Sequence, residues 1–461
     1  MTSTPPKCFA VSFRYLNRWS VNSFSITDWR WPTDIIRPLS DALFRKFVEA
    51  DKETTKLQDL KLATLHFSGE MELRWQGGNK PVKGRLWWAE PGDVIYSKID
   101  VRHGAIGIVP EKLGRICVTS EFPVYAVDSA YFNAAYIRLL FRTLTFRRKI
   151  NSMISGASGR KRVQPKDLEN VKVPLPPLPV QKSIVSAWER AKAEIADIQG
   201  RISELEAQIE VDFLAALGLQ KPERAVLPKV LGMKWKDLDR WSVMYNLLAS
   251  TSVDIAGGNY PVQTLGDIAT VSYGIQKCAA NRPAQYARPY LRVANVQRGA
   301  LDLSEIKTIN VPDEDMPGLR LEPGDLLVCE GNSADLVGRP AIWQGEIPDC
   351  VHQNHILKVR VNKELVLPEY VLEYMQTTPA RIHFRSRAKF TTNLASINSN
   401  DLRELKLAVP PLSEQQTIIK KVKAQRKTIA DLKTEADKKA KRAKKDVEAM
   451  ILGAKPVPHA N

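Results

Sequence analysis

Apolar residues recur in alternating steps of three and four along two long stretches of the chain. Such a heptad seam predicts coiled-coil helices, and it is narrower than the apolar face of most single core-facing helices. The first helix is expected over 180–218 and the second over 413–453. The seam residues are Ile184, Trp188, Ile195, Ile198, Ile202, Leu205 and Ile209 in the first, and Ile418, Val422, Ile429 and Leu432 in the second.

Proline-rich segments lie directly before both helices. PLPPLP at 174–179 and VPPL at 409–412 favour an extended path, because proline removes a backbone donor and restricts the residue before it. We therefore expect the first helix to begin near Val180. Upstream of each segment the pattern changes to short apolar runs separated by turns, such as EPGDVI at 90–95 and EPGDLL at 322–327, which predict strands.

The same order of features occurs twice. RWSV stands at 18–21 and again at 240–243. DLENVKVPLPPLPVQKSIV at 167–185 aligns without a gap with DLRELKLAVPPLSEQQTII at 401–419, and eight of the 19 positions are identical. FLAALG ends the first helix at Gly218 and EAMILG ends the second at Gly453. The chain is therefore interpreted as two copies of one unit.

This repeat predicts an α+β protein with two similar α/β domains. The expected parts are a first domain at 1–179, a helix at 180–218, a linker at 219–235, a second domain at 236–412, a helix at 413–453 and a tail at 454–461. If the helices pair antiparallel, a pseudo-two-fold axis relates the domains. The 38 residues from Val180 to Leu217 would then span roughly 57 Å at about 1.5 Å per residue.

Charge favours pairing of the two helices. Residues 181–212 carry four basic and seven acidic side chains, whereas 414–445 carry twelve basic and four acidic ones. Helices of opposite sign attract along their flanks. The surplus lysines of KKAKRAKK at 438–445 leave two interpretations open, a solvated face or contact with phosphate.

Composition narrows the class of protein. The net charge of +17 is typical of a protein with a polyanionic partner, usually nucleic acid. The five cysteines form no CxxC pair, which argues against a zinc finger and suits a reducing cytoplasm. No apolar run reaches the roughly 18 residues of a membrane span, and MTSTPPKC is unlike a secretory signal. A cytoplasmic protein without membrane contact is expected.

Motifs for catalysis are missing from the sequence. It has no phosphate-binding GxxxxGK[ST] loop, no GxSxG elbow, no HExxH pair and no Asn-Pro-Pro or Asp-Pro-Pro run. Only His352 and His355 lie close together among the histidines, and the strand-like pattern around them would point the two to opposite faces. A non-catalytic binding protein without a metal site is therefore predicted.

The repeated DL…PPL segment with its heptad helix, PYLRVANVQRG at 289–299 and EPGDLL resemble the specificity subunit of Type I restriction-modification systems. The resemblance implies two target-recognition domains, each reading one half of a bipartite site in double-stranded DNA. It also implies that the paired helices set the spacing and dock two modification subunits. Those subunits, and not this chain, would bind S-adenosylmethionine and methylate adenine, and restriction subunits can join the complex.

Two other interpretations stay open: a different tandem-domain nucleic-acid-binding protein, and an interaction scaffold that acts through its coiled coil. Side chains able to form paired hydrogen bonds with base edges are chiefly Arg, Lys, Asn and Gln. In loops of the first domain the candidates are Lys98, Arg102, His103, Arg160, Lys161 and Arg162. In the second they are Gln276, Lys277, Asn295, Gln297, Arg298, Asn332, Arg339, Arg385, Arg387, Lys389 and Asn393. Phosphate contact or a solvated charge is the alternative for each.

Overall fold

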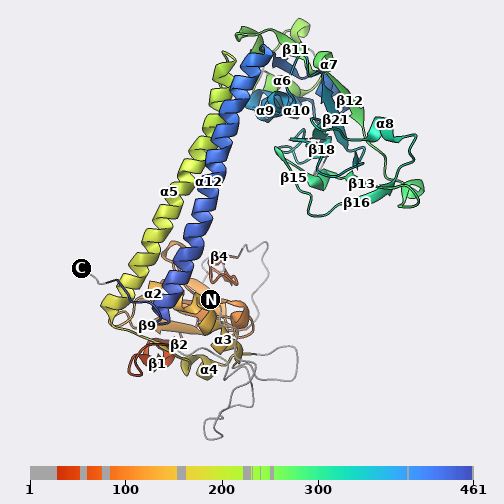
Figure 1. Cartoon of the computed structure of the whole chain (residues 1–461). Coiled ribbons are helices and arrows are strands. Elements are labelled where there is room, and N and C mark those ends of the chain that lie inside the picture. Colours follow the sequence, from red (N-terminus) through yellow and green to blue (C-terminus); the bar gives the residue numbers. More distant parts are fainter. Residues whose placement is uncertain are drawn as a thin grey trace. The chain divides into compact units, whose positions relative to one another are not determined.

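The fold is that of a computed structural model, which describes residues 29–51, 60–74, 84–152, 162–221, 230, 232–238, 240–249, 254–391 and 394–458. The first RWSV, at 18–21, lies outside these residues. The chain divides into two compact units, one made of 1–198 and 435–461 and the other of 199–434 (Figure 1). Each unit mixes helix and sheet, as the sequence predicts, and each is described by itself.

The first unit contains ten strands and three short α-helices among its described residues, together with the first part of a long helix. The strands are β1 (Ile36–Pro38), β2 (Leu43–Lys46), β3 (Ala63–Leu65), β4 (Met71–Leu73), β5 (Leu86–Ala89), β6 (Val94–Tyr96), β7 (Ile106–Ile108), β8 (Ile116–Thr119), β9 (Val124–Val127) and β10 (Lys172–Pro174). The helices are α2 (Ala134–Arg142), α3 (Leu144–Ser152), α4 (Pro165–Glu169) and the start of α5 (Leu178–Ala216).

The second unit repeats this order and contains additional strands and helices. Its strands are β11 (Val262–Thr264), β12 (Ala269–Tyr273), β13 (Ala287–Leu291), β14 (Val296–Gln297), β15 (Ala300–Leu301), β16 (Lys307–Asn310), β17 (Leu326–Cys329), β18 (Gly331–Asn332), β19 (Pro340–Ile342), β20 (Val351–His352), β21 (Ile356–Val361), β22 (Lys389–Phe390), β23 (Ala395–Ser396) and β24 (Lys406–Ala408). Its helices are α6 (Val243–Ala249), α7 (Leu265–Ile268), α8 (Met316–Leu319), α9 (Pro368–Gln376), α10 (Thr378–Arg387), α11 (Ser399–Arg403) and the start of α12 (Leu412–Ile451).

The central sheets of the two units have matching topology. Four antiparallel strands follow the order β2-β9-β6-β7 in the first unit and β12-β21-β17-β19 in the second. A separate two-stranded ribbon joins β1 to β10 and, equivalently, β11 to β24. The units differ beyond this frame, because β13 pairs with β16 and β20 in a further sheet of the second unit. The sequence repeat is therefore a structural repeat whose copies diverge outside the central sheet.

A buried glutamine fixes the start of each long helix in the same way. The Gln181 amide donates to the carbonyls of Pro176 (2.7 Å) and Tyr131 (3.1 Å), and its oxygen accepts from the backbone of Asn133. Gln415 repeats these contacts 234 positions later, with Pro410 at 2.7 Å and with the backbone of residues 365 and 367. Because both side chains are fully buried and their polar groups bonded, they hold the proline segment against the helix.

The long helices begin two residues before Val180 and one before Ser413, at Leu178 and Leu412. Each ends on a glycine with a φ of 73°, Gly218 after α5 and Gly453 after α12. A left-handed residue at this position closes a helix at little cost only for glycine. The carbonyl just before Gly218 accepts from the Asn259 backbone at 2.9 Å, and the one just before Gly453 accepts from the Arg30 backbone at 2.7 Å.

The helix ends are exchanged between the two sequence copies. The end of α5, with Phe213, Leu214 and Leu217, belongs to the apolar core of the second unit. The end of α12, with Val447, Met450 and Ile451, belongs to that of the first. Each unit therefore takes the start of one long helix and the end of the other.

The seam residues lie between the two helix segments of each unit. Ile184, Ile198, Ile202, Ile418, Val422, Ile429 and Leu432 are buried, and Trp188, Ile195, Leu205 and Ile209 are half-buried. In the second unit Lys421 contacts Asp212 at 3.0 Å and Lys433 contacts Glu206 at 2.8 Å. In the first, Lys439 contacts Glu194 at 2.8 Å. The segments are antiparallel, and within the described part of the chain no helix is long and apolar enough to span a membrane.

Candidate nucleic-acid interface

Two predicted loops of the first unit meet in space. The Val163 backbone donates to the carbonyl of Lys98 at 2.8 Å, which joins the loop after β6 to the segment before α4. Arg162 pairs with Glu121 at 3.3 Å, and the Lys98 ammonium donates to the Ser120 carbonyl at 2.6 Å. Lys98 and Arg162 therefore lie at one surface. Arg160 and Lys161 belong to the same segment but lie outside the described residues.

Arg102 and His103 occupy a short 3-10 helix, Asp100–His103, beside that surface. The His103 ring is exposed and lies against Phe67, with ring centroids 5.4 Å apart. The Nε of Arg102 is buried and meets no hydrogen-bond partner among the residues that the structure describes. The structure thus brings four of the six candidates of the first unit into neighbouring loops.

Several candidates of the second unit are exposed cations or amides. Gln276 and Lys277 follow β12, Gln297 ends β14, Arg385 lies in the last turn of α10, and Lys389 begins β22. Lys277, Arg385 and Lys389 have no ion-pair partner in the described part of the chain. Free charges of this kind suit phosphate or base contact. Asn393 lies outside the described residues.

Burial contradicts the prediction for Asn295 and Arg339. Asn295 is 3% exposed, and its amide donates to the carbonyls of residues 302 and 305 at 2.8 and 3.0 Å. Arg339 is 7% exposed and donates to the Val293 carbonyl at 2.9 Å. Both side chains hold the backbone around β14, because buried donors need partners inside the fold. Neither can reach a base edge without unfolding this segment.

Arg298 and Asn332 are intermediate cases. The Arg298 guanidinium is half-buried and donates to the Asp335 carbonyl at 2.7 Å. Its pKa is lowered by burial and by the nearby charges of Arg381 and Arg339. Asn332 is half-buried and accepts from the Ser333 backbone at 2.8 Å. These contacts leave part of each side chain accessible to a ligand.

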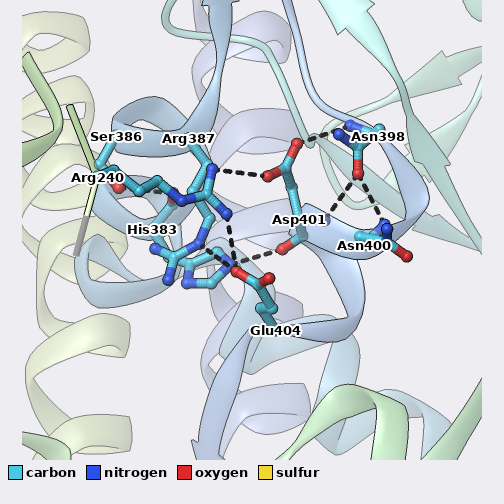
Figure 2. A network of polar contacts seen from close by, with 8 residues as sticks. All are labelled: Arg240, His383, Ser386, Arg387, Asn398, Asn400, Asp401 and Glu404. Carbon is cyan, nitrogen blue, oxygen red and sulfur yellow. Dashed lines mark hydrogen bonds and ion pairs between the residues drawn. The ribbon is translucent and has the colours of Figure 1, made fainter. Parts of the chain in front are cut away.

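Arg387 is held in the polar network shown in Figure 2. It pairs with Glu404 at 3.1 Å, and its side chain is 17% exposed. Arg240 of the second RWSV pairs with the same carboxylate at 2.9 Å and with Asp401 at 3.1 Å. Both guanidinium groups also lie over the Tyr245 ring, at 5.6 and 5.3 Å from its centroid. These contacts of Arg387 serve the fold, and its contact with DNA stays a prediction.

The sequence did not predict that these residues form one polar network. His383 lies within it, bonded to the Asp401 carbonyl at 2.7 Å, and burial beside the Arg387 charge lowers its pKa to about 3. Asp401 also accepts from the Asn398 backbone at the start of α11. One available signal was that Arg240 and Asp401 both stand in motifs found twice in the sequence. The network fixes the segment around α6 to the second unit.

The two neighbouring histidines lie in different surroundings. His352 is fully buried at the end of β20, whereas His355 is exposed and pairs with Glu330 at 2.7 Å. Burial lowers the pKa of His352 to about 4. No cluster of His, Cys, Asp and Glu suited to a metal occurs among the described residues.

Comparison with known proteins identifies the repeated unit. The family model of the Type I restriction modification DNA specificity domain matches residues 91–207 and 331–441, one stretch in each sequence copy. A Methanocaldococcus jannaschii protein named as the MjaX type I restriction enzyme specificity subunit is 31% identical over 29% of this chain and 31% of its own length. The EcoKI specificity subunit of Escherichia coli is 23% identical over 63% of this chain and 58% of its own.

Both matches span less than two thirds of the relative's length. A solved structure describing assembly and conformational transition of the type I R-M system contains a chain with a TM-score of 0.56 and 16% identity. That comparison covers 93% of this chain and 98% of the other, and it shows a shared fold. Because the specificity-domain model matches both copies of the repeat, each copy contains a Type I restriction modification DNA specificity domain.

Proposed function

We propose that this protein is the DNA specificity subunit of a Type I restriction-modification complex. Each unit reads one half of a bipartite sequence in double-stranded DNA. The observation that carries the proposal is that one central sheet occurs twice while the elements around it differ. A shared frame with different loops suits two readers of different bases, because specificity arises from side chains at base edges and not from the scaffold.

The exposed cations supply the attraction for DNA. Lys277, Arg385 and Lys389 in the second unit, and Lys98 with Arg162 in the first, lie at exposed or partly exposed loop and helix-end positions. The chain's net charge of +17 acts in the same direction. Neutralising phosphates releases counterions and favours binding. Within this group, the residues that read bases determine the sequence, and the others position the duplex.

The long helices have a second task in this proposal. They form an antiparallel coiled coil that relates the two readers by a pseudo-two-fold axis and sets the gap between the half-sites. They also dock two modification subunits. The chain itself carries no catalytic group for methyl transfer, so S-adenosylmethionine binds to those partner subunits, and restriction subunits can join the same assembly. The sequence supports this role because it contains no GxxxxGK[ST] loop, GxSxG elbow, HExxH pair, or Asn-Pro-Pro or Asp-Pro-Pro run.

Methylation mapping tests the function directly. The chain is expressed with the modification subunit of its own system in cells without other adenine methylation, and methylated adenines are mapped across the genome. We expect a single bipartite sequence with a gap of fixed length. Cells with the modification subunit alone serve as control. Methylation that is independent of this chain, or that follows no bipartite sequence, would refute the proposal and favour a scaffold role.

A further inference from the structure

The four residues of the second RWSV divide into two that serve the fold and two that do not. Arg240 bridges Asp401 and Glu404. The Ser242 hydroxyl accepts from the Tyr245 backbone at 3.2 Å, and the Ser242 carbonyl accepts from the Asn246 amide at 2.8 Å. These contacts secure the first turn of α6. They give a structural reason for Arg and Ser in the motif.

Trp241 and Val243 point outward instead. Trp241 is 84% exposed and Val243 is 78% exposed. Trp235, 80% exposed, meets Trp241 edge to face with ring centroids 5.9 Å apart. A groove of about 570 Å³ runs along these side chains, and its apolar lining comes from Met233, Trp235, Leu238, Trp241, Val243 and Leu247. Contiguous exposed apolar side chains of this kind mark interaction surfaces.

The first RWSV contains the same Trp and Val as the second, together with the same Arg and Ser. Trp19 and Val21 hold the matching positions in the first copy, which lies outside the described residues. Among the described residues of the second unit, Trp241 and Val243 stay largely exposed and add little to its core. The same pair occurs in both sequence copies and is exposed in the copy that the structure describes, which is explained by one kind of partner that meets the chain twice.

We propose that the groove docks an apolar segment of the modification subunit, one subunit to each RWSV. The inference rests on the proposed function and adds a second contact surface to the docking role of the long helices. Charge selects the kind of segment: Lys234 and Lys236 flank Trp235, are exposed, and have no ion-pair partner among the described residues. An apolar segment bordered by carboxylates complements this rim, and Trp is the side chain most enriched at binding hot spots.

DNA fits the groove less well. Val243 and Met233 offer no hydrogen bond to phosphate or base edges. The two copies must also read different half-sites, so base reading gives no reason to repeat the same pair. Arg240, the cation nearest in sequence to Trp241, is already occupied by two carboxylates.

Assembly of the full-length chain with the purified modification subunit of its system tests the proposal. Mass photometry counts the bound subunits, and a titration gives the dissociation constant of each. We expect Trp241→Ala with Val243→Ser to leave one subunit bound normally and to weaken the other at least about 30-fold, as for a hot spot. Adding Trp19→Ala with Val21→Ser should weaken both.

Tyr286→Ala is the matched control, since Tyr286 is also an exposed aromatic residue of the second unit but lies outside the groove; it should bind two subunits. Unchanged melting temperatures would show that the variants fold. Wild-type assembly by the Trp241 and Val243 double variant overturns the proposal, as does a variant that weakens DNA affinity instead. If the wild-type chain itself binds no modification subunit, the proposed function is what fails.

Discussion

Arg385 and Arg387 lie two residues apart, yet their surroundings differ. Arg385 is exposed and has no ion-pair partner among the described residues, whereas Arg387 pairs with Glu404 and lies over Tyr245. We therefore expect Arg385→Ala to weaken DNA binding without loss of stability, and Arg387→Ala to lower stability first.

The sizes of the two effects follow from the contacts. The Arg387–Glu404 pair is partly exposed, at 17% and 50%, so its loss costs about 0.5–1 kcal/mol. The contact with the Tyr245 ring adds roughly 0.5–1 kcal/mol. Glu404 keeps Arg240 as a partner, so no buried charge is stranded. A total of about 1–2 kcal/mol corresponds to a melting temperature lower by about 2–8 °C. Arg385→Ala should change stability by less than about 0.5 kcal/mol.

For DNA affinity we expect the opposite order, with the larger loss in Arg385→Ala and the smaller loss in Arg387→Ala. Loss of one base contact by Arg385→Ala costs about 1–3 kcal/mol, or roughly 5- to 150-fold in the dissociation constant. Fluorescence anisotropy with the methylated sequence found by mapping measures this, and differential scanning calorimetry measures the melting temperature. Equal losses of stability in the two variants would refute the assignment, and so would an Arg387→Ala protein of normal stability whose DNA affinity alone is reduced.

Three further predictions concern pH, salt and spacing. Burial lowers the pKa of His352 to about 4 and that of His383 to about 3, so the folded state binds fewer protons than the unfolded state below pH 6.5; each histidine should lower the free energy of unfolding by about 2 kcal/mol from pH 7 to 5, and in urea titrations His352→Leu should show a fall about 2 kcal/mol smaller than that of the wild type. Log affinity for DNA should fall linearly with log salt by about 0.9 per phosphate neutralised, and Lys277→Ala should flatten the slope by about one such unit; a slope of zero would contradict the electrostatic reasoning. Four helix-forming residues inserted after Leu205 add roughly 6 Å and about 40°, close to the turn of one base pair, so mapping should show a gap longer by one; an unchanged gap in an active variant would mean that α5 does not set the spacing.

The sequence predicts regular features well because they depend on local periodicity. Steps of three and four from Ile184 to Ile209 fix which side of α5 is covered, and the residues expected on the seam are buried or half-buried. Prolines limit where α5 and α12 begin, and Gly218 and Gly453 end them with positive φ. The repeat was visible because it preserves order over both copies. None of these conclusions needed knowledge of long-range contacts.

Side-chain roles at the interface depend on partners that are distant in sequence. Arg339 was selected as a loop cation, but its guanidinium donates to a carbonyl 46 positions away. Arg240 and its partner Asp401 are separated by 161 positions. A pattern of Arg, Asn and Gln in loops does not reveal whether a carbonyl or carboxylate lies within reach, and burial of the donor then decides between structure and recognition. That is why burial contradicts the prediction for Asn295 and Arg339, whereas base contact by Arg387 stays a prediction.

Domain boundaries drawn along the sequence do not capture the exchange of helix ends between the two copies. Phe213, Leu214 and Leu217 are encoded with the first copy but complete the core of the second unit, and Met450 and Ile451 do the reverse. Removing buried side chains of this size costs several kcal/mol, so neither unit retains its stability when the other copy's helix end is absent. The helices are consequently part of both cores, and a change in the length or pitch of either helix acts directly on the elements that hold the reading loops. If the helices set the spacing of the half-sites as proposed, each unit is attached to the spacer through its own core.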